Sequence, residues 1–288
     1  MYSESFDYYR AKTVAEALSL LRKHKDSRVL AGGHSLLPAM KLRLASPRAL
    51  VDIGGIKGLS GIKAKGKTLE IGALTTHSEV AASTLVERSC GILAEAASQI
   101  GDLQVRNRGT IGGSLAHADP AADYPTVILA LDARLTAAGP KGKREIEAGK
   151  FFRDLFTTAL KPGELLTTVR VPTYGKGTGG AYVKHPHPAS SYCVVGVAAL
   201  LETQNGRCRR ATVAVGGVTA NPVRAAAAED ALAGSRLDEA ALAAAAKLVA
   251  GALSDPLSDP YASGEFRVHL ATVLAKRALT AAAARARG

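Results

Sequence analysis

Two glycine-rich stretches contain the residues whose types and spacing could do chemistry. The first, VLAGGHSLLPAM, runs from Val29 to Met40, and the second, GTIGGSLAHADPAADYP, runs from Gly109 to Pro125. A Gly-Gly pair lets the backbone approach an anion closely, and a helix that starts just beyond it offers free N–H groups and a partial positive charge. Two such loops predict one ligand held at both ends, with a pyrophosphate bound without a metal.

Each stretch also has a simpler interpretation, in which Gly-Gly marks an ordinary tight turn. Hydroxyl groups favour the anion site, because Ser35, Thr110 and Ser114 are placed to donate to a phosphate. Neither stretch fits GxGxxG or GxxxxGK followed by Ser or Thr, so support for a Rossmann or P-loop site is weak. No triad and no dedicated acid or base for substrate chemistry stands out.

The first stretch is positioned by a unit of about 55 residues with α/β character. A helix is predicted over 13–24 and a short strand over 28–31, which the glycines interrupt. Ser35 is expected to cap the next helix, and a strand over 49–53 closes the unit. The predicted order is helix, strand, helix, strand.

The second stretch lies in a longer unit of strands and helices. A strand meets a helix at Thr76, three residues before Glu79, which is capping-box spacing. The remaining predictions are helices over 91–101 and 125–133 and strands over 134–138, 144–148 and 164–172.

A third unit follows Gly175–Gly180, which is predicted to be a linker. The dipeptide Asn205-Gly206 is the strongest hairpin signal, and alanine-rich helices are predicted over 222–233, 237–253 and 265–284. The fold class is therefore α+β. We place a first domain at 1–175, divided into 1–55 and 56–175, and a C-terminal domain at 176–288.

Composition excludes several classes of protein. The chain has 288 residues, of which 47% are hydrophobic and 22% charged, and this excludes a disordered chain. Its net charge of +12 comes from scattered basic residues, so an anionic cofactor or an acidic partner is favoured over nucleic acid. No apolar run reaches the length of a membrane span, and the first residues lack a signal-peptide core, so the expected location is cytoplasmic, with the inner face of the membrane as the alternative. Cys90, Cys193 and Cys208 are too far apart for a zinc or iron–sulfur site.

Taken together, the two stretches resemble the flavin-binding medium subunit of the molybdenum hydroxylase family, which includes aerobic carbon monoxide dehydrogenases and xanthine dehydrogenases. LAGGHSLLPAMKLRLASP (30–47) and QVRNRGTIGGSLAHADPAADYP (104–125) carry the resemblance. FDYYRAKTVAEAL, PGELLTTVRVP and the strand with Lys184 extend it over nearly the whole chain. The resemblance implies a PCMH-type FAD-binding domain of two subdomains and a smaller α+β C-terminal domain.

In that family FAD lies extended between the first two subdomains, with its pyrophosphate on the two glycine loops. The implied contacts are Ala31, Gly32, Gly33, His34, Ser35 and Leu36 in the first loop and Thr110, Ile111, Gly112, Gly113 and Ser114 in the second. Ser114 departs from the asparagine that is frequent in the family, although its hydroxyl can still donate to a phosphate.

Other positions match residues around the flavin. Asp123 matches an acidic residue that holds a ribityl or ribose hydroxyl, with Asp119 as the second candidate; a helix-capping role is the alternative for Asp123. Lys184 matches a lysine whose charge stabilises reduced anionic flavin, and a solvated strand lysine is its alternative.

Three further matches have structural alternatives. The segment Ile100, Gly101 and Asp102 resembles the one beside the adenine or ribityl portion, although it is also typical of a helix end with a Gly stop. Leu166 matches a flavin contact but equally a buried strand residue. Tyr192 resembles an aromatic residue that covers one flavin face, or else belongs to the core.

The resemblance implies an electron-transfer subunit of a carbon monoxide dehydrogenase-like enzyme, whose noncovalent FAD takes electrons from iron–sulfur clusters and passes them to an external acceptor. Molybdopterin and the 2Fe–2S clusters would lie on a large and a small partner subunit, in a dimer of heterotrimers. Two alternatives stay open: a self-contained FAD oxidase or reductase, with His34 as a covalent attachment point, and a non-catalytic scaffold.

Overall fold

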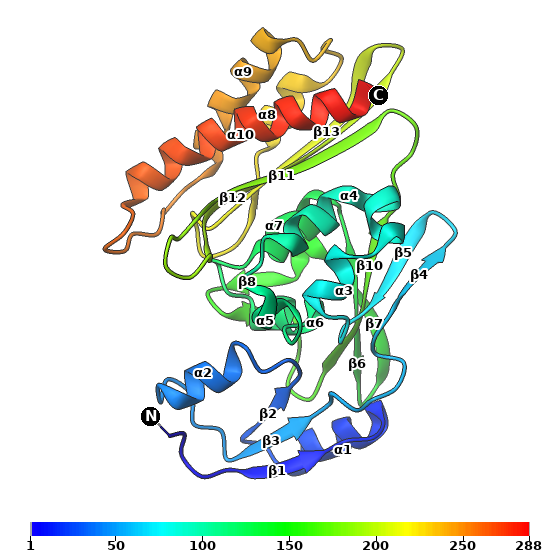
Figure 1. The fold of residues 1–288 in the computed structure, drawn as a ribbon, viewed down its shortest axis with the longest axis vertical. Coiled ribbons are helices and arrows are strands. Elements are labelled where there is room, and N and C mark those ends of the chain that lie inside the picture. The colour runs from blue at the N-terminus through cyan, green and yellow to red at the C-terminus, as the bar shows by residue number, and fades with distance from the viewer. Residues whose placement is uncertain (1, 288) are drawn as a thin grey trace.

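The computed structural model describes residues 2–287, and it confirms the α+β class. Three units follow one another along the long axis of the molecule, from the N-terminal unit at the bottom of Figure 1 to the C-terminal unit at the top. None of the helices in 2–287 is long and apolar enough to cross a bilayer.

The N-terminal unit is a small parallel sheet with the strand order β1-β3-β2. Its elements are β1 (Asp7–Arg10), α1 (Val14–Lys23), β2 (Ser27–Leu30), α2 (Leu36–Lys41) and β3 (Ala49–Asp52). The predicted order of elements was incomplete, because β1 precedes α1. The side chains of β1 are mostly exposed, so this strand lacks the buried alternation from which a strand is predicted.

The middle unit is a five-stranded antiparallel sheet with helices packed on it. Its strand order is β4-β5-β10-β6-β7. The strands are β4 (Ile62–Lys65), β5 (Thr68–Gly72), β6 (Arg134–Gly139), β7 (Gly142–Glu147) and β10 (Leu165–Pro172). The helices are α3 (His77–Ala81), α4 (Thr84–Ser98), α5 (Leu103–Arg106), α6 (Ile111–His117) and α7 (Asp123–Ala130). Between β7 and β10 lie a 3-10 turn, η1 (Ala148–Lys150), and a small hairpin of β8 (Phe152–Asp154) and β9 (Thr157–Thr158).

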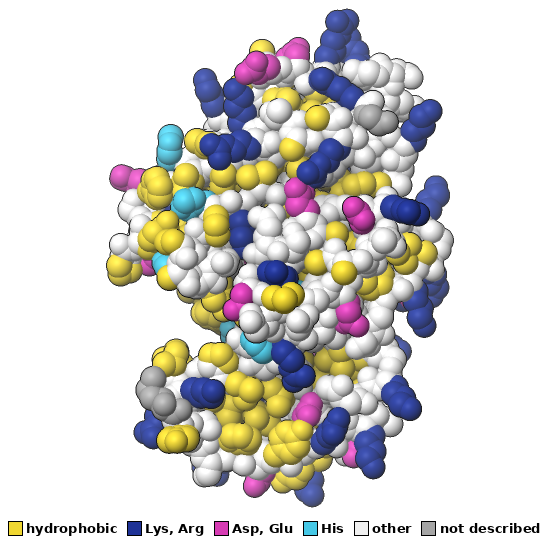
Figure 2. Space-filling model, in the orientation of Figure 1, with side chains coloured by type: hydrophobic (Ala, Val, Ile, Leu, Met, Phe, Trp, Pro, Cys, Tyr) yellow, Lys and Arg dark blue, Asp and Glu magenta, His cyan; other side chains and the backbone are white. Residues whose placement is uncertain are grey.

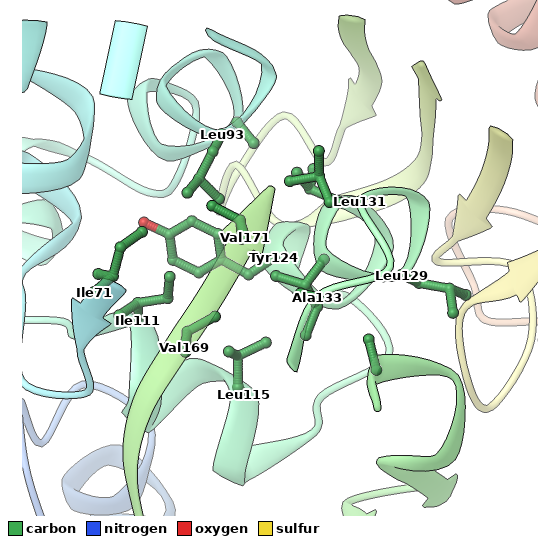
Figure 3. Close-up of a cluster of buried hydrophobic side chains, with 14 of the residues drawn as sticks. Ile71, Leu93, Ile111, Leu115, Tyr124, Leu129, Leu131, Ala133, Val169 and Val171 are labelled. Carbon is green, nitrogen blue, oxygen red and sulfur yellow. The ribbon is translucent and has the colours of Figure 1, made fainter. Parts of the chain in front are cut away.

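The core of the middle unit surrounds Tyr124, which has no exposed surface. Figure 3 shows its ring among Ile71, Ile111, Val169 and Val171, which come from β5, α6 and β10. Helix α7 is buried along its whole length, which is why its sequence is apolar without an amphipathic period. This core therefore holds α6 and α7, and the second glycine stretch at their start, in fixed positions.

The C-terminal unit is a four-stranded antiparallel sheet covered by helices. Its strands are β11 (Thr178–Pro186), β12 (Cys193–Gln204), β13 (Arg207–Gly216) and β14 (Val223–Arg224). Its helices are α8 (Ala226–Leu232), α9 (Glu239–Leu248) with the 3-10 turn η2 (Val249–Ala252), and α10 (Gly264–Arg287), which lies across β11 and β12 in Figure 1. The hairpin at Asn205-Gly206 is confirmed, with both residues at positive φ.

Two predicted boundaries in this unit were wrong. The linker was assigned to Gly175–Gly180, but β11 already begins at Thr178, because Gly179 and Gly180 pack closely under α10 and Tyr174. The first alanine-rich helix begins at Ala226 instead of position 222, because Val223 and Arg224 pair with β13.

The middle and C-terminal units are joined by an ion pair and its hydrogen bonds. Arg285 of α10 donates to both carboxylate oxygens of Glu95 in α4, at 2.8 and 3.0 Å. The backbone N–H of Tyr182 in β11 also donates to Glu95, at 3.0 Å. Glu95 thus connects α4 to two elements of the C-terminal sheet and helix layer.

Candidate functional site: two glycine loops and a buried lysine

The first glycine loop runs from the end of β2 to the start of α2. Gly33 has a φ of +79°, a backbone conformation that glycine adopts without cost. The backbone N–H groups of Gly32, Gly33, His34 and Ser35 have no hydrogen-bond acceptor within residues 2–287. Ser35 occupies the N-cap position of α2, but its predicted capping role is wrong, since its hydroxyl makes no cap hydrogen bond. The loop therefore presents free N–H donors, and Leu36 is the first residue of the helix that follows them.

The second glycine loop is the first turn of α6. The N-cap residue Thr110 accepts a hydrogen bond from the N–H of Gly113 at 3.1 Å. A Cβ on Gly112 would lie 2.4 Å from that of Ala73, so only glycine fits against this neighbour. Ile111 is fully buried in the core behind the loop.

The two loops meet backbone to backbone. A Cβ on Gly32 would lie 2.1 Å from the carbonyl oxygen of Arg108, and a Cβ on Gly113 would lie 3.8 Å from that of Ala31. Gly-Gly here is therefore more than a turn signal, because the close approach of the loops excludes any side chain at Gly32. The predicted convergence of the two stretches is present in the fold.

The predicted set of free N–H groups is found in the first loop only. At the start of α6, the N–H of Ile111 donates to the carbonyl of Thr75 and that of Gly112 to the carbonyl of Ala73, at 3.0 and 2.8 Å. Gly113 and Ser114 both donate to Thr110. The prediction of free helix N-terminal amides in the second loop was wrong, because the preceding chain occupies them. The hydroxyl of half-buried Ser114 supplies a donor there.

A buried histidine beside the loops was missed by the sequence reasoning. His77 is 4% exposed, and its ring occupies the space that a Cβ on Gly109 would fill. Burial, together with the nearby charges of His34 and Arg106, lowers the pKa of His77 to about 4. Its Nδ1 has no hydrogen-bond partner among residues 2–287. The only sequence signal was its place next to the Thr76 capping box. His34 itself is exposed, and its Nδ1 lies 3.1 Å from the carbonyl oxygen of Gly32.

The segment Ile100–Asp102 has the helix-end structure that was its alternative interpretation. Gly101 has a φ of +49° just after α4, and Asp102 caps α5 by accepting from the N–H of Val105 at 2.7 Å. Arg106 donates to the carbonyls of Ile100 and Gly101 at 3.0 and 2.9 Å. These bonds fix the segment, and a contact with a ligand stays a prediction.

Asp123 and Lys184 form a buried ion pair between the middle and C-terminal units. The Nζ of Lys184 lies 3.0 Å from the carboxylate of Asp123, and the two side chains are 3% and 5% exposed. The hydroxyl of Tyr182 donates to the same carboxylate at 2.7 Å. Burial raises the pKa of the Asp123 carboxyl, while the charge of Lys184 and the two hydrogen bonds lower it. Neither alternative interpretation holds: Ala122, not Asp123, is the N-cap of α7, and Lys184 is not solvated.

The remaining candidates lie at the surface and in the core. Tyr192 is 47% exposed, so its interpretation as a core residue was wrong. Half-buried Asp119 accepts a hydrogen bond from the N–H of Ala121 at 2.9 Å. Partial burial of Tyr192 raises the pKa of its hydroxyl, and the charge of Asp119 raises that pKa further. Leu166 is 3% exposed in the main core. Figure 2 shows hydrophobic side chains beside histidines along the left edge of the molecule.

The glycine loops lie apart from the hollow between the middle and C-terminal sheets. A cavity of about 260 Å³ between β10, β12 and β13 is lined by residues that include Tyr174, Lys176 and Arg209, and none of the predicted site residues lines it. We assign the site to the glycine loops, because a dinucleotide can lie along open backbone donors without an enclosed cavity. No group of three or more metal-binding side chains occurs within 2–287. All three cysteines are free and buried.

FAD fits the residues that are present. A diphosphate needs closely spaced N–H donors and no side chain between them and the backbone, which the loop at Gly32 and Gly33 provides. The loop has no carboxylate that would repel a diphosphate. The positive charges of His34 and Arg106 lie close enough to the site to contribute to lowering the pKa of His77. The site is therefore compatible with the anionic part of a dinucleotide.

Comparison with known proteins agrees with this geometry. Residues 4–174 match the family described as the FAD binding domain in molybdopterin dehydrogenase, and residues 180–282 match the CO dehydrogenase flavoprotein C-terminal domain. The chain is 39% identical to the carbon monoxide dehydrogenase medium chain of Afipia carboxidovorans, over 100% of both chains. It is 38% identical to the 6-hydroxypseudooxynicotine dehydrogenase complex subunit alpha of Paenarthrobacter nicotinovorans, over 100% of this chain and 97% of the relative.

A solved structure of carbon monoxide dehydrogenase from Hydrogenophaga pseudoflava has the same fold, with a TM-score of 0.96 and 39% identity over 99% of each chain. The chain therefore belongs to the family of FAD-binding medium subunits of molybdenum-dependent dehydrogenases, and the predicted family is confirmed.

Proposed function

We propose that this chain is the electron-transfer subunit of a carbon monoxide dehydrogenase-like complex. The observation that supports it most is the meeting of the two loops at Gly32 and Arg108, with free N–H groups on one side of the contact. When bound, FAD would supply the redox chemistry, by which electrons pass from iron–sulfur clusters to an external acceptor.

The chain's own residues would bind and orient the cofactor. The first loop, from Ala31 to Leu36, would hold the pyrophosphate through its backbone, and Ser114 would add a hydroxyl from the second. Gly101 and Asp119 would lie beside the extended part of the cofactor. Asp123 and Lys184 hold each other, so their contribution is to the shape of the site.

The proposed partners come from the family to which the chain belongs. The family resemblance implies a small subunit with the iron–sulfur clusters and a large subunit with molybdopterin, and the three isolated cysteines of this chain agree with clusters held elsewhere. We propose a dimer of heterotrimers in the cytoplasm. We propose no single substrate, because the carbon monoxide dehydrogenase medium chain and the 6-hydroxypseudooxynicotine dehydrogenase complex subunit alpha are nearly equal in identity to this chain.

The test is the visible spectrum of the chain with FAD, purified alone and after co-expression with its partner subunits. A flavin spectrum whose colour is released into the supernatant by acid supports noncovalent FAD. Colour kept in the pellet would show covalently attached FAD, point to His34 as the attachment residue and favour a self-contained oxidase. A folded chain that takes up no FAD, alone or in its complex, would overturn the proposal.

A further inference from the structure

A buried polar cluster links three segments that sequence alone does not connect. At its centre, Lys184 of β11 lies between the end of α4, the start of α7 and the loop 187–192. Its Nζ donates to the carbonyl of Gln99 at 2.7 Å, to Asp123 at 3.2 Å and to the carbonyl of Ser191 at 2.9 Å. An ammonium group has three protons, so each of its donors has an acceptor within the protein.

Because its three protons are used in these bonds, Lys184 has none left for a direct hydrogen bond to a flavin. A lysine that hydrogen-bonds a flavin directly needs a free donor, and all three donors of Lys184 are used within the protein. Besides the through-space effect of its charge, Lys184 can therefore act on a bound cofactor through the groups that it holds. Two of them lie at helix ends, Gln99 directly after α4 and Asp123 at the start of α7, whereas Ser191 lies in an irregular loop.

The loop 187–192 has an unfavourable backbone conformation. Ser191 has a φ of +58°, in the left-handed region that non-glycine residues avoid. The N–H of Ser191 donates to the carbonyl of His187 at 2.8 Å, and the N–H of His187 donates to the carbonyl of Tyr192 at 2.7 Å. The lysine bond to Ser191 thus stabilises a tight turn whose next residue is Tyr192, with its ring half exposed.

We propose that Lys184 is a positioning residue that fixes the 187–192 loop and so holds the ring of Tyr192 in one orientation before a cofactor binds. This inference rests on the proposed function, and on the family resemblance by which Tyr192 matches an aromatic residue that covers one flavin face. Asp123 supplies the charge that keeps the ammonium group in place, and Tyr182 orients that carboxylate.

If Lys184 only linked the middle and C-terminal units, a different result would be expected. The Glu95–Arg285 pair also joins the middle and C-terminal units, but it makes no hydrogen bond to the 187–192 loop. Arg285→Met is therefore the matched control for Lys184→Met. If both residues only link the two units, Lys184→Met and Arg285→Met should affect the loop equally. If Lys184 positions the loop, only Lys184→Met should affect it.

The first measurement is hydrogen exchange of the backbone amides of 187–192, all but Pro188, in the full chain, which needs no cofactor. Lys184→Met is expected to raise their exchange by about tenfold or more, while Arg285→Met leaves it at the wild-type rate. Equal exchange in wild type and Lys184→Met would overturn the inference. If Lys184→Met does not fold, Asp123→Asn with Lys184→Met removes both charges and carries the same expectation.

The second measurement is flavin fluorescence of the FAD-loaded protein, because a stacked tyrosine quenches it. Lys184→Met and Tyr192→Leu should each raise the fluorescence, and the double variant should equal Tyr192→Leu alone, since the lysine acts through the tyrosine. Additive increases would contradict this. A wild-type protein that takes up no FAD would contradict the proposed function, and the exchange experiment would still decide the role of Lys184.

Discussion

Gly32 lies against the backbone carbonyl oxygen of Arg108, so closely that a Cβ on Gly32 would be 2.1 Å from that oxygen. The contact joins the N-terminal and middle units at the site where the first loop offers its free N–H groups. Because this carbonyl belongs to the backbone, it cannot rotate away to make room, as a flexible side chain could.

Gly32→Ala should therefore weaken FAD binding by about tenfold or more, since the loops must separate to admit the methyl group. The measurement is the dissociation constant of FAD from fluorescence titration. Gly91→Ala is the control, because a Cβ there meets nothing within 4 Å. Wild-type affinity in Gly32→Ala would show that the loop contact is not needed for binding.

Stability should depend on pH through His77. Its folded-state pKa of about 4 lies below the ordinary 6.5, because burial disfavours the charged ring. Between pH 6.5 and pH 4 the unfolded chain binds a proton at His77 that the folded chain does not. The free energy of unfolding is therefore highest above pH 6.5 and decreases as the pH falls towards 4. The loss amounts to roughly 3 kcal/mol.

The free energy of unfolding in urea, measured from pH 7 to pH 4, checks this dependence. His77→Leu should flatten the curve over that range, whereas His269→Gln, at an exposed position, should leave it as in the wild type. An unchanged slope in His77→Leu would assign the pH dependence to other groups.

The Glu95–Arg285 pair should contribute measurably to holding the C-terminal unit. Arg285→Met removes three hydrogen bonds, two to Glu95 and one to the backbone carbonyl of Gly180, and leaves Glu95, which is only partly exposed, without its cation. The expected loss of unfolding free energy is about 1–2 kcal/mol, reduced from a buried pair because Arg285 is half exposed.

Lys276→Met provides the comparison, since Lys276 pairs with highly exposed Glu239. Its effect should stay below about 1 kcal/mol. Equal losses in the two variants, measured by urea denaturation, would mean that burial does not decide the strength of these pairs.

The native protein should resist thiol reagents. Cys90 and Cys193 are buried, and burial raises the pKa of each thiol to about 12. At pH 8 only roughly one thiol in ten thousand would be ionised at such a pKa, and the thiolate is the reactive form. Cys208 is buried too, and burial raises its pKa.

A colorimetric thiol assay should therefore detect no rapid reaction in the native chain and full reaction of Cys90, Cys193 and Cys208 after unfolding. Ser190→Cys, at an exposed loop position, should add one rapidly reacting thiol and serves as the positive control. A rapid native reaction would point to local opening around one of the buried cysteines.

Local sequence signals located most of the elements that carry the site. The Thr76 capping box, the Asn205-Gly206 hairpin and the strand ending at Pro172 depend on neighbouring residues, so they were predictable. Strand β1 was not, because its four residues expose most of their side chains and gain their stability from pairing with β3.

By itself the sequence determined the two glycine loops and the family to which they belong, because glycine at a strand end has few conformational substitutes. Only the tertiary structure decided which amides stay free, since Ala73 and Thr75 occupy those of Ile111 and Gly112. It also decided that Lys184 meets Asp123, 61 residues away. Contacts over such separations depend on how whole units pack, and no local pattern of residues encodes them.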